Sequence, residues 1–383
     1  MPKIAILAGE ASGDLIGSHL MSYLNSKIKN IEFIGVGGPE MSKNGLISYF
    51  DYKEISVHGY FDALKKIFRL LSLRSNLVDY LLKERPDIFI GIDAPDFNFG
   101  VERRLKFNNI PTFHYVAPSV WAWRQGRVFE IKENVDHLFA VFPHEPKIFQ
   151  KAKVPITFVG HPLASKIPLN PNINKGREKL NLDKGKTIIT LLPGSRLSEI
   201  KYHFELMINT AILINKELTW RKLKQAEFLI PINSKENYDH MASMLNLYSN
   251  KIKSINLLIG HSHDAICSSN MVIAVSGTAT LEAALYKKPM VIVYKTSLLS
   301  YFLLKKMLLI PYVGLPNILL KKFIVPEFLQ NSATPENISD KAIEILTDKK
   351  FQKYLKVKFK DLHTKLKRNS SELIYKKIIK YLK

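Results

Sequence analysis

Small polar residues and a fixed cation follow two apolar runs in the second half of this sequence, where they could bind phosphate. After TIITLL the chain continues with Gly194, Ser195 and Arg196, and a Gly-Ser turn before an arginine suits a phosphate or diphosphate. After MVIAV, backbone N–H groups and hydroxyls at a predicted helix start would form an anion cradle. That cradle comprises Ser276, Gly277, Thr278, Ala279 and Thr280.

Glu282 lies one turn into the helix that follows this cradle, within reach of a ribose diol. For both turns the alternative is an ordinary helix start. In that case Arg196 is solvated, and Glu282 interacts only with the helix dipole.

An acid or base is predicted in the first half of the chain. Asp93 is the first polar side chain after the apolar run DIFIGI, so partial desolvation should raise its pKa. At a strand end facing an interdomain cleft, it could take a proton from a substrate hydroxyl. The alternative is an aspartate that only caps a turn.

A second turn in the first half, GEASGD, contains Ser12 between Gly9 and Gly13. Its spacing matches neither the dinucleotide fingerprint nor a P-loop. It is therefore either a ligand contact or simply a tight turn.

Aromatic and amide side chains supply further candidates. Trp121 and Trp123 follow the run TFHYV, where indole rings would stack on a sugar or pack in the core. Arg124 would meet a phosphate. Asn317, in the segment GLPN, would reach a ligand or its own backbone.

The sequence predicts no metal site. It contains no DxD pair, which commonly bridges a divalent cation and a diphosphate. His261 and His263 flank Ser262, but no cysteine and no second histidine pair supports a zinc site. Arg196 and helix dipoles would then stabilise the charge of a leaving diphosphate.

The strands that would position these turns are short and apolar throughout. This pattern is typical of parallel strands covered on both faces, and the helix-like segments between them favour right-handed βαβ units. The first half contains Lys3–Ala8, Ile31–Val36, Asp87–Ile92, Thr112–Val116, His137–Phe142 and Ile156–Gly160. The second contains Thr187–Leu192, Glu227–Ile232, Ile255–Gly260, Met271–Val275 and Met290–Tyr294. The sequence predicts an α/β protein with two Rossmann-like, doubly wound domains.

The domain boundaries follow from composition. Residues 1–167 form the first predicted domain and residues 187–345 the second. Between them, residues 168–186 are rich in Pro, Asn, Gly and Lys and are interpreted as a linker. Residues 346–383 are Lys-rich and helical by periodicity.

Length and composition agree with this division. At roughly 100–200 residues per domain, 383 residues suggest two domains, and 46% of them are hydrophobic. Cys267 is the only cysteine, so nothing indicates an oxidising compartment. The run IAILA is too short for a signal peptide, and no run would span a membrane. We expect a cytoplasmic protein.

The chain is strongly basic, with 56 Lys and Arg against 34 Asp and Glu and a formal net charge of +22. This excess indicates nucleic acid, an acidic membrane or a phosphorylated substrate as partner, or else merely solvated helix faces. Nucleic acid is disfavoured because the basic residues lie in a tail and on apolar helices, without stacking aromatic residues interleaved for contact with bases.

Together the turns favour an enzyme that holds a nucleotide diphosphate in one domain and offers an acid or base from the other. A glycosyltransferase that uses a nucleotide-diphosphate sugar fits this division. An NAD dehydrogenase fits less well, because neither glycine turn carries its fingerprint.

The sequence closely resembles the lipid-A-disaccharide synthase family in seven motifs. The resemblance extends from the first strand to beyond Asn317. The seven motifs are GEASGD, GIDAPDFN, HYVAPSVWAWR, FVGHPLA, LLPGSR, SGTATLE and LPN. IDAPDFN and SVWAWR are highly specific. The departures are minor: Ala11 and Ala117 stand where Thr and Ser are familiar in relatives.

The resemblance implies a GT-B fold whose carboxyl-terminal helices cross back toward the first domain. It implies transfer of 2,3-diacylglucosamine from UDP to the 6-hydroxyl of 2,3-diacylglucosamine 1-phosphate (lipid X), with inversion, and without metal or cofactor. The product would be the β-1,6 disaccharide 1-phosphate of lipid A biosynthesis. The alternative is another GT-B enzyme using a UDP-sugar, such as a peptidoglycan glycosyltransferase or a UDP-GlcNAc epimerase.

Carried over residue by residue, the resemblance makes Asp93 the base and SGTATLE the UDP-binding turn, with Glu282 near the ribose. It adds further site residues, which are Gly9, Ser12, Gly194, Ser195, Arg196 and Asn317.

Because both substrates would carry acyl chains, the resemblance also implies that the enzyme acts at the cytoplasmic face of the inner membrane. We expect residues 60–83, residues 297–310 and the Lys-rich tail to dock on anionic lipid, where each basic residue contributes about 1 kcal/mol. The alternative is core-facing helices with a solvated basic face. The sequence leaves a homodimer open.

Overall fold

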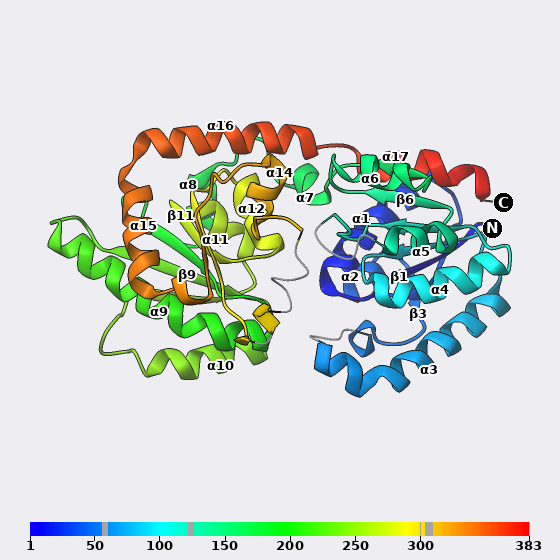
Figure 1. Ribbon diagram of the computed structural model, residues 1–383, viewed down its shortest axis with the longest axis horizontal. Helices are drawn as coiled ribbons and strands as arrows, with labels where there is room; N and C mark the ends of the chain where they lie inside the picture. Colours follow the sequence, from blue (N-terminus) through cyan, green and yellow to red (C-terminus); the bar gives the residue numbers. More distant parts are fainter. Residues whose placement is uncertain (56–59, 122–125, 299, 303–308, 383) are drawn as a thin grey trace. The chain divides into compact units, whose positions relative to one another are not determined.

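The computed structural model describes residues 1–55, 60–121, 126–298, 300–302 and 309–382 (Figure 1). The chain forms two compact units. Unit 1 comprises Met1–Ser165 and Lys365–Lys383, and unit 2 comprises Lys166–Thr364. Each unit contains one sheet of parallel strands with helices packed on it. The predicted α/β class with two Rossmann-like domains is confirmed.

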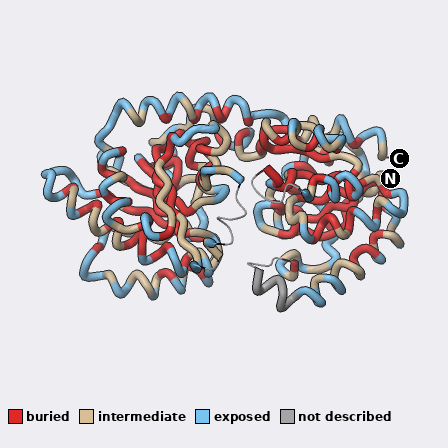
Figure 2. The backbone as a smooth tube through the Cα atoms, viewed as in Figure 1, coloured by how far each residue is buried: buried red, intermediate tan, exposed pale blue. Residues whose placement is uncertain are grey.

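The sheet of unit 1 has seven strands in the order β3-β2-β1-β4-β5-β6-β7. Their bounds are β1 Lys3–Ala8, β2 Glu32–Val36, β3 Leu46–Ser48, β4 Ile88–Ile92, β5 Thr112–Tyr115, β6 His137–Ala140 and β7 Ile156–Phe158. The central strands β1 and β4 are buried almost along their whole length, as Figure 2 shows. Buried aliphatic side chains of this kind stabilise the fold by about 1.5–3 kcal/mol each.

Helices cover both faces of this sheet. Leu77 and Leu81 of α3 and Leu105 of α4 belong to one core cluster with Leu7 and Phe89 of the sheet. The helices of unit 1 are α1 Ala11–Lys27, α2 Pro39–Ser42, α3 Tyr60–Glu84, α4 Pro95–Phe107, α5 Arg127–Asn134, α6 Glu145–Lys151, α7 Pro162–Lys166 and α17 Ser370–Ile378, with 3-10 turns η1 Tyr52–Glu54 and η3 Ile379–Tyr381.

The last residues of the chain pack on unit 1. The rings of Tyr23 in α1 and Tyr375 in α17 lie 6.1 Å apart, and those of Phe113 and Tyr381 lie 5.4 Å apart. The backbone N–H of His161 donates to the carbonyl of Leu366. Residues 365–383 of the Lys-rich segment therefore complete the helix layer of the first sheet, whereas residues 346–364 belong to unit 2.

The sheet of unit 2 has six parallel strands in the order β10-β9-β8-β11-β12-β13. Their bounds are β8 Thr187–Leu192, β9 Ala226–Ile232, β10 Ile255–Ile259, β11 Met271–Val275, β12 Met290–Tyr294 and β13 Glu327–Leu329. The strand order reverses once between β8 and β11, just as the first sheet reverses between β1 and β4. Both sheets therefore have one topological switch point.

Long amphipathic helices cover the second sheet. Phe204 of α9 and Ile338 of α15 belong to its largest core cluster, together with Ile189 and Ile273 of the strands. The helices are α8 Ile173–Lys179, α9 Leu197–Trp220, α10 Lys235–Asn246, α11 Ser262–Ser268, α12 Thr278–Leu285, α14 Leu315–Leu320, α15 Pro335–Thr347 and α16 Lys349–Leu366, with the 3-10 turn η2 Gln330–Ser332.

The interpretation of residues 168–186 as a linker is wrong. They belong to unit 2 and contain α8, in which Arg177 is only 4% exposed. The Arg177 guanidinium donates to the carbonyl of Ser268 at 3.1 Å and to Oδ1 of Asn270 at 2.8 Å. The side chain of Asn172 caps α8. The residues that suggested a linker are thus caps and turns around a short docked helix.

The described part of the chain contains no helix with the length and apolar character needed to cross a membrane.

Asp14, the last residue of the GEASGD turn, joins α1 to the loop after β2. Its Oδ1 accepts the N–H groups of Gly38 at 2.8 Å and Met41 at 3.0 Å, and its Oδ2 accepts that of Glu40 at 3.0 Å. The carboxylate is 3% exposed and satisfies the amino terminus of α2. This acidic residue is therefore structural.

Replacing Asp14 by Ala should lower the free energy of unfolding of unit 1 by about 2–3 kcal/mol, because three N–H groups, two of them in buried bonds, lose a charged acceptor. The measurement is urea unfolding followed by circular dichroism. The control is Asp79→Ala, whose side chain is 63% exposed and should lose less than about 1 kcal/mol. Equal losses in the two variants would contradict the capping role.

Candidate functional site

The switch point of the first sheet brings two predicted turns together. β1 and β4 pair in parallel with Ala8 opposite Ile92, so the turns that begin at Gly9 and Asp93 leave the same edge side by side. A Cβ added at Gly9 would lie 2.9 Å from the Cβ of Ala94. Ligands of doubly wound sheets bind at this place, beyond the carboxyl ends of the strands. Gly9 is therefore explained by the close approach of the neighbouring turn.

The turn at Asp93 is conformationally strained. Asp93 and Ala94 both have left-handed backbones, with φ of +51° and +42°, and Pro95 then opens α4. A left-handed conformation costs roughly 1–2 kcal/mol for an ordinary residue, and Ala94 has no polar side chain to offset it. Strain of this kind is concentrated at functional sites. The Asp93 side chain is half-buried, as the sequence led us to expect.

Ser12 lies nearby in the chain, on the exposed first turn of α1. Since α1 follows β1 directly, Ser12 and Asp93 start from neighbouring strands of the same sheet. The structure thus places the three predicted residues of unit 1, Gly9, Ser12 and Asp93, at one edge.

The tryptophan segment after β5 is partly described. Trp121 is 9% exposed and donates its indole N–H to Oε1 of Glu145 at 3.3 Å. Its ring meets those of Phe142 and His144 edge to face. Trp121 is therefore a core residue in this structure, whereas Trp123 and Arg124 lie outside the described residues.

Two buried titratable groups in this region were not predicted. Glu145 accepts the N–H groups of Val141 and Phe142, and burial raises its pKa to about 8. Burial lowers the pKa of His161 to about 4, and its ring stacks on Phe142. His161 stands in the motif FVGHPLA, but no local pattern in the sequence indicates that either side chain is buried.

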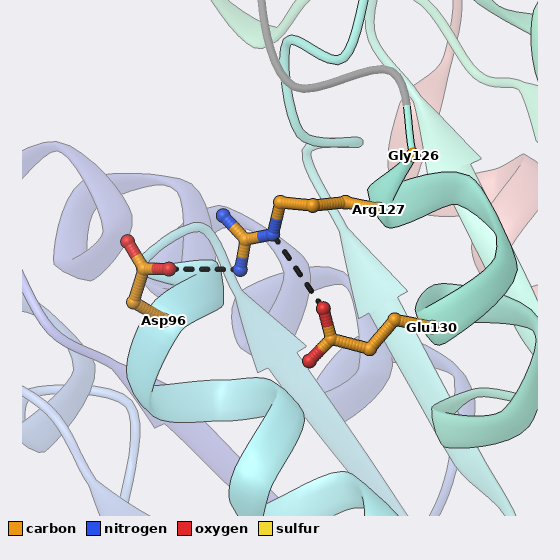
Figure 3. A pocket seen from close by; sticks show the side chains of 4 residues that line it. All are labelled: Asp96, Gly126, Arg127 and Glu130. Atoms are coloured by element: carbon orange, nitrogen blue, oxygen red, sulfur yellow. Dashed lines mark ion pairs between the residues drawn. The ribbon is translucent and has the colours of Figure 1, made fainter.

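A shallow hollow of about 460 Å³ lies beside the first turn of α4, lined by Asp96, Gly126, Arg127 and Glu130 (Figure 3). Arg127 of α5 points between two carboxylates, with Nη2 2.8 Å from Oδ1 of Asp96 and Nε 3.8 Å from Oε2 of Glu130. The second aspartate of IDAPDFN therefore ties α4 to α5.

The switch point of the second sheet brings the other two turns together. β8 and β11 pair in parallel with Leu192 opposite Ala274, so the turns at residues 193–196 and 276–280 leave one edge. The predicted phosphate-binding residues of unit 2 are therefore neighbours.

A carboxylate already occupies part of the predicted cradle at Ser195 and Arg196. Oε2 of Glu199 accepts the N–H of Ser195 at 2.9 Å and that of Arg196 at 3.3 Å, and Oε1 lies 3.6 Å from the Arg196 guanidinium. Gly194 has φ +113°, and a Cβ there would clash with Glu199. Glu199 was missed, although its spacing of three from Arg196 is that of a capping box.

His203 lies one helical turn after Glu199 on α9 and stabilises the start of this helix. Its Nε2 accepts the N–H of Lys295 at 2.8 Å, so its Nδ1 donates to the carbonyl of Glu199 at 2.6 Å. Burial lowers its pKa, which keeps the imidazole neutral. His203 thereby links the start of α9 to the end of β12.

Only part of the predicted hydroxyl cradle after β11 is available to a ligand. The Ser276 hydroxyl donates to the carbonyl of Val313, and the buried Thr280 hydroxyl donates to that of Gly277. Gly277 and Thr278 are exposed at the amino terminus of α12, and Ala279 is half-exposed. The anion-binding capacity of this turn thus lies in the backbone N–H groups and the Thr278 hydroxyl.

Glu282 has a partner that sequence reasoning considered only as a metal ligand. Its Oε1 lies 2.7 Å from Nδ1 of His263, and its side chain is 13% exposed. The Glu282 carboxylate therefore lies against the His263 ring. Among the described residues, no three His, Cys, Asp or Glu side chains are grouped as a metal site would require.

Asn317 was expected to reach either a ligand or the backbone of its own chain, and in this structure its side chain binds the backbone. The side chain is completely buried. Its Oδ1 accepts the N–H groups of Ile324 and Val325, and its Nδ2 donates to the carbonyl of Val325 and to Oε1 of Glu327. Because every polar atom of the amide is used internally, Asn317 shapes the segment between α14 and β13.

Comparison with known proteins gives a match along nearly the whole chain. A family model described as lipid-A-disaccharide synthetase matches residues 4–378. The lipid-A-disaccharide synthase of Methylobacillus flagellatus is 42% identical over 383 residues, which is 100% of both chains. That of Chromobacterium violaceum is 45% identical over 369 residues, covering 96% of this chain and 94% of its own.

One of the similar solved structures is a UDP-GlcNAc 2-epimerase from Neisseria meningitidis bound to UDP-GlcNAc. It has a TM-score of 0.66 and 14% identity, and the alignment covers 99% of this chain and 100% of that chain. At this identity the likeness concerns the fold alone.

Acidification should reduce the contribution of His161 to stability. Its pKa is about 4 in the folded chain against 6.5 for an ordinary histidine, so the unfolded chain takes up the proton first. The contribution is complete above pH 6.5 and is lost as the pH falls toward 4, by about 2 kcal/mol between pH 7 and pH 5. Acidification has the opposite effect on the contribution of Glu145 to stability, because the pKa of Glu145 is raised in the folded chain.

The test isolates His161 by comparing unfolding free energies of the wild type and His161→Gln at pH 7 and pH 5. The stability difference between the two proteins should shrink at pH 5. His240→Gln, at an exposed position, is the control and should show no such change. A difference that is constant or grows on acidification would contradict the prediction.

Proposed function

Because the chain belongs to the lipid-A-disaccharide synthase family, we propose that it joins two acylated glucosamine units of lipid A. It is a glycosyltransferase, which transfers 2,3-diacylglucosamine from UDP to the 6-hydroxyl of 2,3-diacylglucosamine 1-phosphate and releases UDP. The observation that carries this proposal is the match over residues 4–378. A UDP-GlcNAc epimerase or a peptidoglycan glycosyltransferase is not favoured, since the synthase family matches nearly the whole chain, whereas the epimerase shares only 14% identity.

In the proposed reaction Asp93 is the general base. Its carboxylate accepts the proton of the acceptor hydroxyl while that oxygen attacks the anomeric carbon opposite UDP, which inverts the configuration. The switch-point position and the strained turn support this role. Ser12, exposed on the adjoining helix start, would hydrogen-bond the acceptor.

In unit 2 the diphosphate binds at the ends of β8 and β11. The Arg196 guanidinium and the amino terminus of α12 stabilise the charge that develops on the leaving UDP. Glu199 holds Arg196 in its present position, and phosphate oxygens compete with its carboxylate for the N–H groups of Ser195 and Arg196. Glu282, oriented by His263, accepts hydrogen bonds from the ribose.

Membrane docking is a further part of the proposal. On α3 the side chains of Ile67, Phe68 and Leu71 are 45%, 84% and 43% exposed. In the segment after β12, Leu298 and Phe302 are 66% and 59% exposed, whereas residues 303–308 lie outside the described residues. Large exposed apolar side chains beside basic ones favour a peripheral contact with anionic lipid.

Asp93→Asn should reduce turnover roughly 10²–10⁴-fold, because an amide cannot accept the proton, while UDP binding is unchanged. The measurement is UDP release from the donor in the presence of the acceptor. The matched control is Asp96→Asn in the same motif, which pairs with Arg127 and should retain activity within about threefold. Unaltered turnover in Asp93→Asn would remove Asp93 from the mechanism.

Vesicle flotation tests the membrane contact. Vesicles with anionic phospholipid should bind the protein at low salt and release it at high salt. Phe68→Gln should weaken binding about tenfold, because one exposed aromatic ring no longer enters the bilayer. Phe107→Gln alters a ring that is 88% exposed on α4 and serves as the control. Equal binding by both variants, or binding that salt does not affect, would contradict the proposal.

A further inference from the structure

Three polar side chains are completely buried beneath the turn that carries Asp93. Asn98 and Glu102 lie one helical turn apart on α4, and His114 lies in β5, directly opposite Gly91 of β4. Burying polar groups in an apolar core is unfavourable unless their hydrogen bonds are made. The hydrogen bonds that these three side chains make therefore indicate which part of the structure they hold in place.

Asn98 holds both left-handed residues of the turn. Its Nδ2 donates to the carbonyl of Asp93 at 2.7 Å and to that of Ile92 at 3.4 Å. Its backbone N–H donates to the carbonyl of Ala94 at 3.0 Å. On the other side, the N–H of Asp93 donates to the carbonyl of Tyr115 at 2.9 Å. The position of the Asp93 backbone is thus fixed from two elements.

Glu102, one helical turn along α4 from Asn98, forms a buried pair with His114. Oε1 of Glu102 lies 2.7 Å from Nδ1 of His114, and the His114 ring also contacts Phe99. A Cβ added at Gly91 would clash with Oε1 of Glu102 and lie 3.0 Å from Cγ of Asn98. The absence of a side chain at Gly91 therefore leaves room for both Glu102 and Asn98.

Stability alone does not account for this cluster. Oδ1 of Asn98, Oε2 of Glu102 and Nε2 of His114 are buried without a hydrogen-bond partner among the described residues. Burial also raises the pKa of Glu102. Apolar side chains of the same volume would fill this space at lower energetic cost.

We propose that Asn98, supported by the Glu102–His114 pair, is a positioning residue that holds the Asp93 carboxylate in its reactive place. This inference rests on the proposed function, in which Asp93 is the base. Asn98 touches neither substrate in this account and acts only through the turn. Losing it should therefore affect the chemical step and not the binding of the UDP-sugar.

Asn98→Ala and Asn98→Asp test the proposal, because both remove the amide donor and the aspartate preserves the size. Each should lower kcat about 10- to 100-fold per folded enzyme, the usual effect of a displaced catalytic group, with the KM for the UDP-sugar unchanged. Gly91→Ala is a second test that leaves every hydrogen-bonding group in place but displaces Glu102 and Asn98. It should lower kcat at least about tenfold in the same way.

Val101→Ala is the matched control, since Val101 is completely buried on the same helix and its loss destabilises the core. It should lower the thermal midpoint but keep the wild-type kcat. The proposal is overturned if the folded Asn98 and Gly91 variants turn over within twofold of the wild type, or if Val101→Ala loses as much kcat as they do. Failure of the wild type to form disaccharide would instead overturn the proposed function.

Discussion

Two consecutive left-handed residues, Asp93 and Ala94, impose a backbone constraint to which the switch point of the first sheet is fitted. Strand β4 must turn abruptly into α4, and neither residue is a glycine. The surroundings are built to tolerate this turn: Gly9 leaves room for Ala94, and Asn98 binds the carbonyl of Asp93. A carboxylate on such a turn is presented at a defined place without depending on a flexible loop.

The two units share one topology but carry different side chains at its switch point. Each sheet reverses its strand order once, and each reversal brings two strand-to-helix turns to one edge. In unit 1 that edge carries the carboxylate of Asp93. In unit 2 it carries a cation and the amino terminus of α12, with Glu199 already bound to the N–H groups of the first turn. An anionic ligand would therefore exchange one set of acceptors for another, which limits the cost of desolvating Arg196.

The local sequence pattern was sufficient to predict where the strands and the turns lie, but it did not predict which groups the side chains contact. The eleven predicted strands lie where apolar runs are continuous, whereas β3 and β13 are three-residue edge strands with partly exposed side chains and left no such signal. Asn317 was expected to reach either a ligand or its own backbone, and no motif connects it to residues 324–327, which supply its hydrogen-bond donors and acceptors. The Glu102–His114 pair was missed for the same reason, since only the pairing of β4 with β5 brings it beneath Asp93.

Identification of the product tests the account most directly. Purified protein is incubated with UDP-2,3-diacylglucosamine and 2,3-diacylglucosamine 1-phosphate, and the products are analysed by mass spectrometry and by NMR of the anomeric proton. The account predicts a disaccharide 1-phosphate with a β-1,6 bond and one UDP per disaccharide. UDP without disaccharide, an epimerised sugar or an α-linked product would contradict it.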